Sequence, residues 1–310
     1  MTDTHVIYIA GFGRSGTTLL DRLLCSSLKL PSVGEIVVWA QGFAENRLCS
    51  CGQHFSTCVF WRDVVRVAPA SFDGGRADAT RRYYEHALRS WHMWKLFTAH
   101  RRREVLVEAP FWYESAVGEV YDALATVAKN RIVVDSSKNP TYLWLLANAP
   151  GIRLHVVHCV RDPRAVAFSW QRRLHDPGEG PGGYMNIISP GRSAGLWDLW
   201  NTATVVVCRA LEIPRHLIRY EDLVQAPEQV VSDLVMSLDL PAFSLARDQT
   251  SAHATSHLIS GNPMRFGEFR VRYDDEWHRS LSTRDQLIVT LATLPLLRRF
   301  GYPLLVPRHG

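Results

Sequence analysis

Residues 6–24 read VIYIAGFGRSGTTLLDRLL, an apolar run, a glycine-rich turn and a second apolar run at helical spacing. The first run predicts a buried strand over residues 6–10, and the leucines after the two threonines predict a helix. Glycines over residues 11–16 let backbone N–H groups converge on an anion, and the helix N-terminus adds partial positive charge. The stretch therefore predicts a strand, a phosphate-binding loop and a helix.

The turn departs from the loop of nucleoside triphosphatases at one position. Gly11 and Gly16 have the spacing of GxxxxGK[ST], but Thr17 stands where that motif has its lysine. The cation lies inside the loop instead, at Arg14. Triphosphate hydrolysis depends on that lysine and on a metal-bound hydroxyl, so we expect a ligand with one phosphate beside a transferable oxyanion.

Length and charge limit the possible classes of protein. The chain has 310 residues, 46% of them hydrophobic, and a formal net charge of +5. We expect one domain over residues 1–310, an anionic small ligand and no nucleic-acid partner, because nucleic-acid binding needs a concentrated basic stripe. We expect no membrane span, signal peptide or integral membrane segment, and therefore a cytoplasmic protein. The oligomeric state stays open.

Apolar runs alternate with segments of helical spacing along the chain. Further strands are predicted at 132–134, 154–160 and 216–219. Helices are predicted at 78–103, 113–129, 140–148, from Pro163 onward, and at 283–294 with its leucines on the core. Glycine and proline predict a long loop at 176–192. The pattern predicts an α/β fold, a P-loop-like three-layer sandwich with a central parallel sheet and a helical, aromatic-rich, acceptor-side insertion at about 35–130.

Cations and hydroxyls follow each predicted strand. In an open parallel sheet, ligands bind at the carboxyl ends of the strands. The residues at these ends include Arg14, Ser15, Thr17 and Thr18, then Ser136, Ser137 and Lys138, then Arg161 and Ser169, and then Arg219 and Tyr220. Basic residues at several strand ends indicate a ligand with more than one phosphate-like group.

Three of these segments resemble motifs of the sulfotransferase family. GFGRSGTT (11–18) resembles its 5′-phosphosulfate loop, CVRDPRAVAFSW (159–170) its 3′-phosphate motif, and IRYEDLV (218–224) its segment beside the adenine. The resemblance implies 3′-phosphoadenosine 5′-phosphosulfate (PAPS) as co-substrate and 3′,5′-ADP as product. The nucleotide-binding residues that it implies are Gly13, Arg14, Ser15, Gly16, Thr17, Thr18, Arg161, Ser169, Tyr220 and, from the match of Met264-Arg265-Phe266-Gly267 to a basic loop of cytosolic members, Arg265.

Sulfuryl transfer to a hydroxyl needs a general base and cations that meet charge on the leaving phosphate. Arg14 and Lys138 are predicted to be those cations. Glu35, in PSVGEIVVW (31–39), is predicted as the base, and its Gly-Glu placement resembles the tyrosylprotein sulfotransferase branch and some bacterial members. The alternative for Glu35 is an acid that a helix N-terminus stabilises. No metal is expected, because a sulfate ester carries less charge than a triphosphate.

Other acidic and basic residues leave rival interpretations open. His155 and His158 lie in a predicted buried strand and are expected to be core residues. Asp135 resembles the strand-end aspartate that holds magnesium in triphosphatases, but we expect it to orient the turn at 136–138. The two rival functions are a P-loop nucleotide kinase or NTPase that uses Asp135 for magnesium, and a non-catalytic module that binds a 3′-phosphonucleotide.

The acceptor is expected to be a small or lipophilic molecule with a hydroxyl group. Aromatic side chains between the phosphate loop and Asp135 are candidates for lining an apolar acceptor pocket. These are Trp39, Trp91, Trp94 and Trp112. A protein tyrosine on the secretory route is disfavoured, because we recognise no signal or anchor in the sequence.

Three of the six cysteines cluster in the segment RLCSCGQHFSTCVFW. Cys49, Cys51 and Cys58, with His54 between them, could hold zinc, although the spacing matches no standard finger. A disulfide between Cys51 and Cys58 and three free thiols are the alternatives. All three interpretations give the cluster a structural role.

Overall fold

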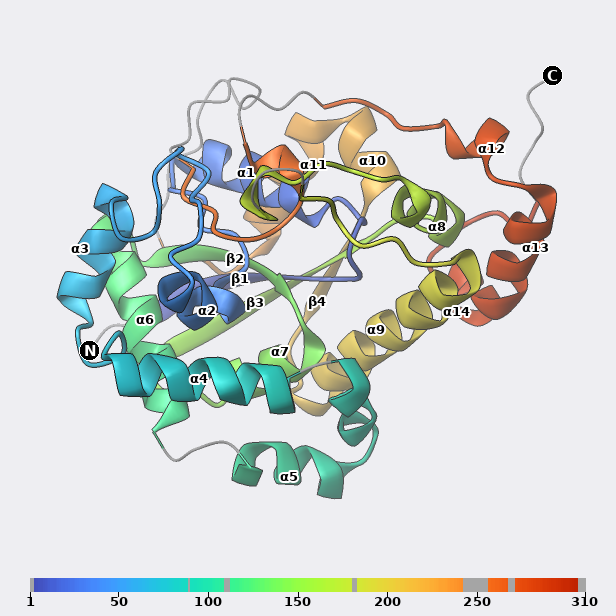
Figure 1. Ribbon diagram of the computed structural model, residues 1–310. Helices are drawn as coiled ribbons and strands as arrows, with labels where there is room; N and C mark the ends of the chain where they lie inside the picture. The colour runs from blue at the N-terminus through green and yellow to red at the C-terminus, as the bar shows by residue number, and fades with distance from the viewer. Residues whose placement is uncertain are drawn as a thin grey trace.

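A parallel sheet lies at the centre of the molecule (Figure 1). The computed structural model describes residues 3–88, 90–108, 112–179, 183–241, 256–266 and 271–305. Within these residues the sheet has four strands, in the order β2-β1-β3-β4, and all neighbours pair in parallel. The strands are β1 (Thr4–Ala10), β2 (Ile132–Lys138), β3 (Ile152–Val160) and β4 (Arg215–Arg219).

Helices cover both faces of the sheet, which confirms the predicted three-layer α/β fold. Along β1, Val6 and Tyr8 pack into one core, while Ile7 and Ile9 pack into the other. The first core includes side chains from α2 (Trp39–Ala44), α3 (Val59–Val67), α4 (Gly74–Ala87), α6 (Tyr113–Ala128), α7 (Pro140–Leu146) and α9 (Pro190–Ala210). The second includes side chains from α1 (Thr17–Leu28), α10 (Tyr220–Gln225) and α11 (Pro227–Ser237).

Shorter elements complete the described chain. The other α-helices are α5 (Ala99–Glu108), α8 (Pro163–Gln171), α12 (Trp277–Ser280), α13 (Thr283–Ala292) and α14 (Leu294–Arg299). The 3₁₀ helices are η1 (Ile36–Val38), η2 (Ser90–Phe97), η3 (Pro177–Glu179) and η4 (Pro263–Arg265). In the described residues, every helix is too short or too polar to cross a membrane.

Two predictions about helices are wrong. The helix predicted over 78–103 is three elements, α4, η2 and α5. Over two turns the spacing of a 3₁₀ helix is close to that of an α-helix, so the apolar pattern did not separate them. In α13, Leu287 and Leu291 are exposed and Val289 is buried, so the predicted packing of its leucines on the core is also wrong.

The predicted turn after residue 134 belongs to β2 instead. The strand runs on to Lys138, and its pairing with β1 shifts register between Tyr8 and Ala10. A bulge of this kind bends a strand at its end and re-aims its side chains. The predicted loop at 176–192 contains η3 and ends at the first residues of α9, and residues 180–182 lie outside the described part.

The carboxyl group of Asp135 ties three elements together. It is fully buried in β2 and accepts hydrogen bonds from Ser137 N (2.8 Å), Ser137 Oγ (2.5 Å) and Ile36 N (3.3 Å). Its second oxygen accepts one from the hydroxyl of Tyr121 on α6 (2.5 Å). Asp135 thus orients the bulge and fixes the segment that begins η1, as the expected structural role requires.

Replacement of Gly11 by alanine is expected to destabilise the junction of β1 and β3. Gly11 has φ +138°, and an added Cβ would lie 2.2 Å from the carbonyl oxygen of Cys159. Backbone strain and overpacking together should lower the free energy of unfolding by roughly 2–4 kcal/mol, measured by urea denaturation. Gly151→Ala is the matched control, because Gly151 also has positive φ but open space around it. Equal losses in the two variants would contradict the close approach.

The stability of an Asp135→Asn variant relative to the wild type should rise with pH. Burial raises the pKa of Asp135 from 3.8 to about 6. The protonated carboxyl group therefore stabilises the folded wild type fully below the pKa of the unfolded state, and this stabilisation is lost as pH rises through about 6. Because asparagine does not ionise, the variant should gain roughly 2 kcal/mol on the wild type between about pH 4 and about pH 7.5. Urea denaturation at both pH values measures this gain.

The control for this prediction is a carboxyl group on the surface of the same helix as Tyr121. Asp122 forms an exposed ion pair with Arg131, so Asp122→Asn should change stability by under about 1 kcal/mol at either pH. A difference between Asp135→Asn and wild type that does not change with pH would overturn the prediction.

Candidate active site

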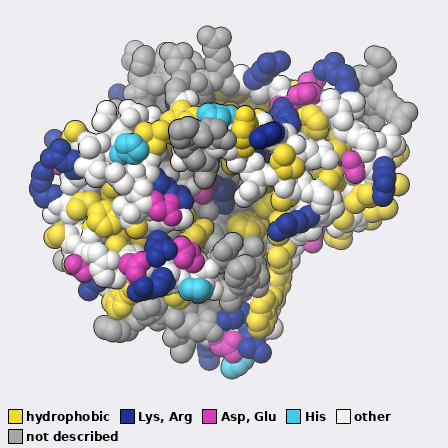
Figure 2. All heavy atoms as spheres, in the orientation of Figure 1, with side chains coloured by type: hydrophobic (Ala, Val, Ile, Leu, Met, Phe, Trp, Pro, Cys, Tyr) yellow, Lys and Arg dark blue, Asp and Glu magenta, His cyan; other side chains and the backbone are white. Residues whose placement is uncertain are grey.

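Two adjoining cavities lie at the carboxyl ends of the strands. The first, which we call the Glu35 cavity, has a volume of about 350 Å³ and is lined by Glu35 and Lys138. The second, the Arg161 cavity, has about 480 Å³ and is lined by Arg161, Ser169 and Tyr220. Both are lined by Arg14, Thr17, Thr18 and Asn262, so the phosphate loop lies where the two cavities meet. Figure 2 shows one face of the molecule hollowed near its centre, with Lys and Arg side chains around the hollow.

The guanidinium group of Arg14 is buried and forms no hydrogen bond with the described residues. The residue is 9% exposed, and its φ of +71° lies in the left-handed region. None of its three guanidinium nitrogens has a hydrogen-bond partner in the described part of the chain. It lies 4.9 Å from the ring of Trp170, and burial, followed by the charge of Arg172, lowers its pKa to about 10. A buried cation of this kind is a binding point for an anionic ligand.

Arg161, Ser169 and Tyr220 come together as their motifs predict. Arg161 follows β3, Ser169 lies on α8, and Tyr220 begins α10. The Arg161 guanidinium stacks 4.3 Å from the Tyr220 ring and lies 3.3 Å from the carboxylate of Asp274. Its Nε has no hydrogen-bond partner among the described residues. Arg161 therefore keeps one donor for a ligand in addition to its ion pair.

Asp274 and Arg172 are residues of the Arg161 cavity that sequence reasoning missed. Asp274 forms a second ion pair with Arg172 at 2.8 Å. Burial raises the pKa of Asp274, but Arg161 and Arg172 outweigh burial and hold it below its usual value. The sequence alone assigned no role to the segment around Asp274. No local pattern marks it, because its partners lie about a hundred residues earlier in the chain.

Glu35 and Lys138 meet in the other cavity. The Glu35 carboxylate and the Lys138 ammonium form an ion pair across 103 residues of sequence, and the ammonium also donates to the carbonyl oxygen of Ser136 (3.1 Å). The backbone N–H of Ser136 in turn donates to the carbonyl of Gly34 (3.0 Å), which anchors the Glu35 segment on β2. Both side chains are mostly buried, so this pair is only partly screened by water.

Arg265 does not join Arg161. It lines the Glu35 cavity, where its guanidinium forms two hydrogen bonds with the carboxylate of Asp176 (2.8 and 3.1 Å) and one with the carbonyl of Gly261 (2.5 Å). In the described residues it is not part of the Arg161 cavity lining, although its sequence match implied a place near the 3′-phosphate. Gly267, the last residue of that match, lies outside the described residues.

The remaining predicted loop residues, Gly13, Ser15 and Gly16, contribute through their backbone. Gly13 lines the Glu35 cavity, and its carbonyl accepts a hydrogen bond from Trp170 Nε1 (3.3 Å). Gly16 caps α1 with φ +89° and lines the Arg161 cavity. Ser15 is fully buried, and its carbonyl accepts from the thiol of Cys159 (3.1 Å). Ser15 is not among the described residues that line the two cavities, unlike its neighbours Arg14 and Gly16.

His155 and His158 are buried residues of β3, as expected. His158 is fully buried and its ring nitrogens contact Asn201 Oδ1 (2.7 Å) and Arg215 (2.8 Å). His155 pairs with His5 at 3.0 Å. Neither histidine is among the described residues of either cavity lining.

Of the four tryptophans that were candidates for lining an acceptor pocket, the three with described side chains line neither cavity. Trp39 packs in the core against Phe72, Trp94 is half exposed, and neither they nor Trp112 belong to the described cavity linings. The side chain of Trp91 lies outside the described part. Trp170 and Tyr184 line the Glu35 cavity instead. Aromatic content alone did not distinguish core residues from cavity residues, because both positions favour large apolar rings.

Comparisons with known proteins address the family and the fold of the chain. A search of curated proteins finds no match to the chain. The fold is similar to that of a solved structure, the sulfotransferase domain from the Synechococcus PCC 7002 olefin synthase, with 18% identity and a TM-score of 0.53. That similarity covers 99% of this chain and 97% of that domain. A model of the sulfotransferase family matches residues 7–244, from β1 past α11. The chain belongs to the sulfotransferase family, and transfer of a sulfuryl group is the activity that its family and fold support.

Proposed function

We propose that this enzyme transfers a sulfuryl group from PAPS to a hydroxyl group of a small acceptor and releases 3′,5′-ADP. The observation that carries the proposal is the buried guanidinium of Arg14, which lies where the two cavities meet and has no hydrogen-bond partner among the described residues. A cation there faces both a nucleotide in one cavity and an acceptor in the other. A sulfuryl group that moves between these two ligands would pass beside Arg14.

The Arg161 cavity suits the nucleotide. Its volume is in the range of cavities that bind small molecules, and the loop at Gly16 and the N-terminus of α1 face it. Arg161 has an unpaired Nε and Ser169 supplies a hydroxyl, which are the donors that a 3′-phosphate needs. A phosphate on Arg161 would compete with the carboxylate of Asp274 for the same guanidinium.

The Glu35 cavity suits the acceptor. It combines charged residues with the rings of Trp170 and Tyr184, and Glu35 and Arg47 are its contributions from the predicted insertion at about 35–130. This mixed lining and a volume of about 350 Å³ favour a small hydroxylated molecule with polar as well as apolar groups.

Glu35 is the proposed general base, as in the tyrosylprotein branch that its Gly-Glu placement resembles. When bound, PAPS supplies the sulfuryl group as a mixed anhydride with its 5′-phosphate. Glu35 takes the hydroxyl proton as the acceptor oxygen bonds to sulfur and the bond from sulfur to the bridging phosphate oxygen breaks. Lys138 leaves its ion pair with Glu35 to meet the charge on that oxygen, and Arg14 stabilises the same charge.

Neither rival function is favoured. The oxygens of Asp135 accept hydrogen bonds from Ser137, Ile36 and Tyr121 inside the core, and Asp135 is not part of the described cavity linings. We therefore propose that the transfer step uses Arg14 and Lys138 rather than a magnesium ion on Asp135. The Glu35–Lys138 pair argues against a module that only binds, because binding a nucleotide does not need a base beside the phosphate loop.

Calorimetric titration with 3′,5′-ADP, 5′-AMP and ATP, each with and without magnesium, tests the donor site. We expect 3′,5′-ADP to bind independently of magnesium and more tightly than 5′-AMP. Arg161→Ala should weaken its binding by about 30- to 150-fold, or roughly 2–3 kcal/mol, because a charged hydrogen bond in a dry site is lost. Arg66→Ala is the control, since that arginine is exposed on α3. Magnesium-dependent preference for ATP would show that the proposed donor is wrong.

Replacement of Glu35 by glutamine tests the base. The amide keeps the size of the side chain and an oxygen for Lys138, so the affinity for 3′,5′-ADP should change little. Transfer from labelled PAPS to alcohols of a test panel should slow by about a hundredfold or more. The loss should be smaller with phenols, whose pKa of about 10 makes them easier to deprotonate. Wild-type turnover of alcohols by the variant would rule out Glu35 as the base.

A further inference from the structure

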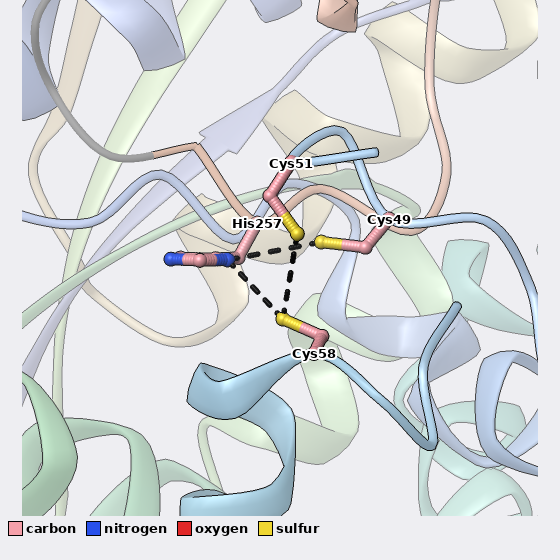
Figure 3. Close-up of side chains that lie close together, drawn as sticks. All are labelled: Cys49, Cys51, Cys58 and His257. Carbon is pink, nitrogen blue, oxygen red and sulfur yellow. Dashed lines mark hydrogen bonds between the residues drawn. The ribbon is translucent and has the colours of Figure 1, made fainter. Parts of the chain in front are cut away.

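Three cysteines and one histidine that are not in the described lining of either cavity converge on one another (Figure 3). They are Cys49, Cys51, Cys58 and His257, which we call the Cys₃His cluster, and one ligand atom from each lies within 4.8 Å of the others. The sulfur atoms of Cys51 and Cys58 are 3.6 Å apart. His257 Nδ1 lies 3.3 Å from the sulfur of Cys58 and 3.8 Å from that of Cys49. All four side chains point toward one centre.

Three of these separations, from 3.3 to 3.8 Å, are close to the edges of a tetrahedron around one metal ion. Zinc binds thiolates at about 2.3 Å and imidazoles at about 2.0 Å, which gives edges of roughly 3.5–3.8 Å between the ligand atoms. A disulfide needs a sulfur–sulfur bond of about 2.0 Å, and all six cysteines of the chain are free. We propose that Cys49, Cys51, Cys58 and His257 bind a zinc ion. Because protein atoms supply all four ligands, the ion has no open position for a substrate and its role is structural.

The sequence interpretation named the wrong histidine for such a site. His54 lies near the cysteines in sequence, but its Nδ1 contacts the carbonyl of Asn46 at 2.9 Å. Residues 48 and 54 form an antiparallel bridge, and between them Gly52, with φ +86°, allows the tight turn that brings Cys49 and Cys51 together. The turn therefore presents both thiols on one side and directs His54 elsewhere.

His257 is held in place from three sides. Its ring stacks on Phe60 at 4.6 Å, with only 4° between the ring planes. Its backbone N–H donates to the carbonyl of Ser32 (2.7 Å), and its carbonyl accepts from Trp61 Nε1 (2.9 Å). Metal-binding histidines need a fixed ring orientation, and these contacts supply one.

The cluster joins the cysteine segment to a wall of the Glu35 cavity. Ser50 N donates to the carbonyl of Leu258 (2.8 Å), and Leu258 N donates to Ser50 Oγ (2.9 Å). The next residues, 259–262, all line the Glu35 cavity. A zinc ion on His257 would fix this wall to the cysteine segment. The inference rests on the cluster and does not depend on the proposed donor or acceptor.

Metal analysis of the full-length protein, purified in reducing buffer without chelator or added metal, is the first test. We expect about one zinc ion per chain, released when a mercurial reagent blocks the thiols and detected with a colorimetric zinc indicator. The chelated protein, reloaded with cobalt chloride, should show the visible bands of tetrahedral cobalt and the near-ultraviolet band of cobalt–thiolate charge transfer. The cobalt experiment uses the wild-type chain, so it does not depend on a variant that folds.

Single substitutions assign the ligands. His257→Gln and Cys51→Ser should lose the zinc ion and the cobalt–thiolate spectrum, and chelation should lower the thermal unfolding midpoint of the wild type. His54→Gln is the matched control and should keep both, because His54 is the nearest histidine in sequence but not part of the cluster. Protein that contains no zinc and takes up no cobalt would overturn the proposal. So would a Cys51–Cys58 disulfide found by mass spectrometry without reduction, or zinc retained in His257→Gln and lost in His54→Gln.

Discussion

An inner strand of the sheet, β1, is buried and apolar over residues 6–10, and this constraint decides where the charges of the neighbouring loop can lie. From Val6 to Ala10 no side chain of β1 has exposed area, because helices cover the strand from above and below. Burial of an unpaired charge inside such a sheet would cost free energy, and several charged groups lie beyond its carboxyl ends instead. Arg14, Lys138 and Arg161 therefore reach the same edge from three neighbouring strands. The buried core therefore helps to determine where the residues of the site lie.

The backbone is strained at two of these three residues, Arg14 and Lys138. Arg14 has φ +71° and Lys138 has φ +68°, in the left-handed region that side chains other than glycine avoid at a cost of roughly 1–2 kcal/mol. They stand at the ends of adjacent strands, and the register shift of β2 lies between them. The fold keeps both conformations because the surrounding core determines them, which is typical of residues under functional constraint. Lys138 and Arg161 each have a carboxylate partner, while in the described residues Arg14 has none.

Features that depend on short segments could be predicted from the sequence, whereas contacts between residues far apart in the chain could not. The strand–loop–helix at the N-terminus, the strands, and the meeting of Arg161, Ser169 and Tyr220 followed from motifs of a few residues. Local spacing gave no sign of the Arg265–Asp176 pair, of Asp274 beside Arg161, or of His257 beside the cysteines, because each joins segments far apart in the chain. The helix expected over 78–103 failed for a different reason, since two helix types share nearly the same short-range periodicity.

The wall of the Glu35 cavity is held at both of its ends. At one end, Trp61 and Ser32 hold the backbone of His257, and at the other the carboxylate of Asp176 holds Arg265. Between these anchors Gly261 passes close to Glu35, since a Cβ there would lie 3.5 Å from a carboxylate oxygen. Asn262 of this wall lines both cavities, whereas Ile259, Ser260 and Gly261 are in the described lining of the Glu35 cavity and not in that of the Arg161 cavity. A substitution at Ile259 or Ser260 would therefore change the lining of the Glu35 cavity and leave the residues that line the Arg161 cavity as they are.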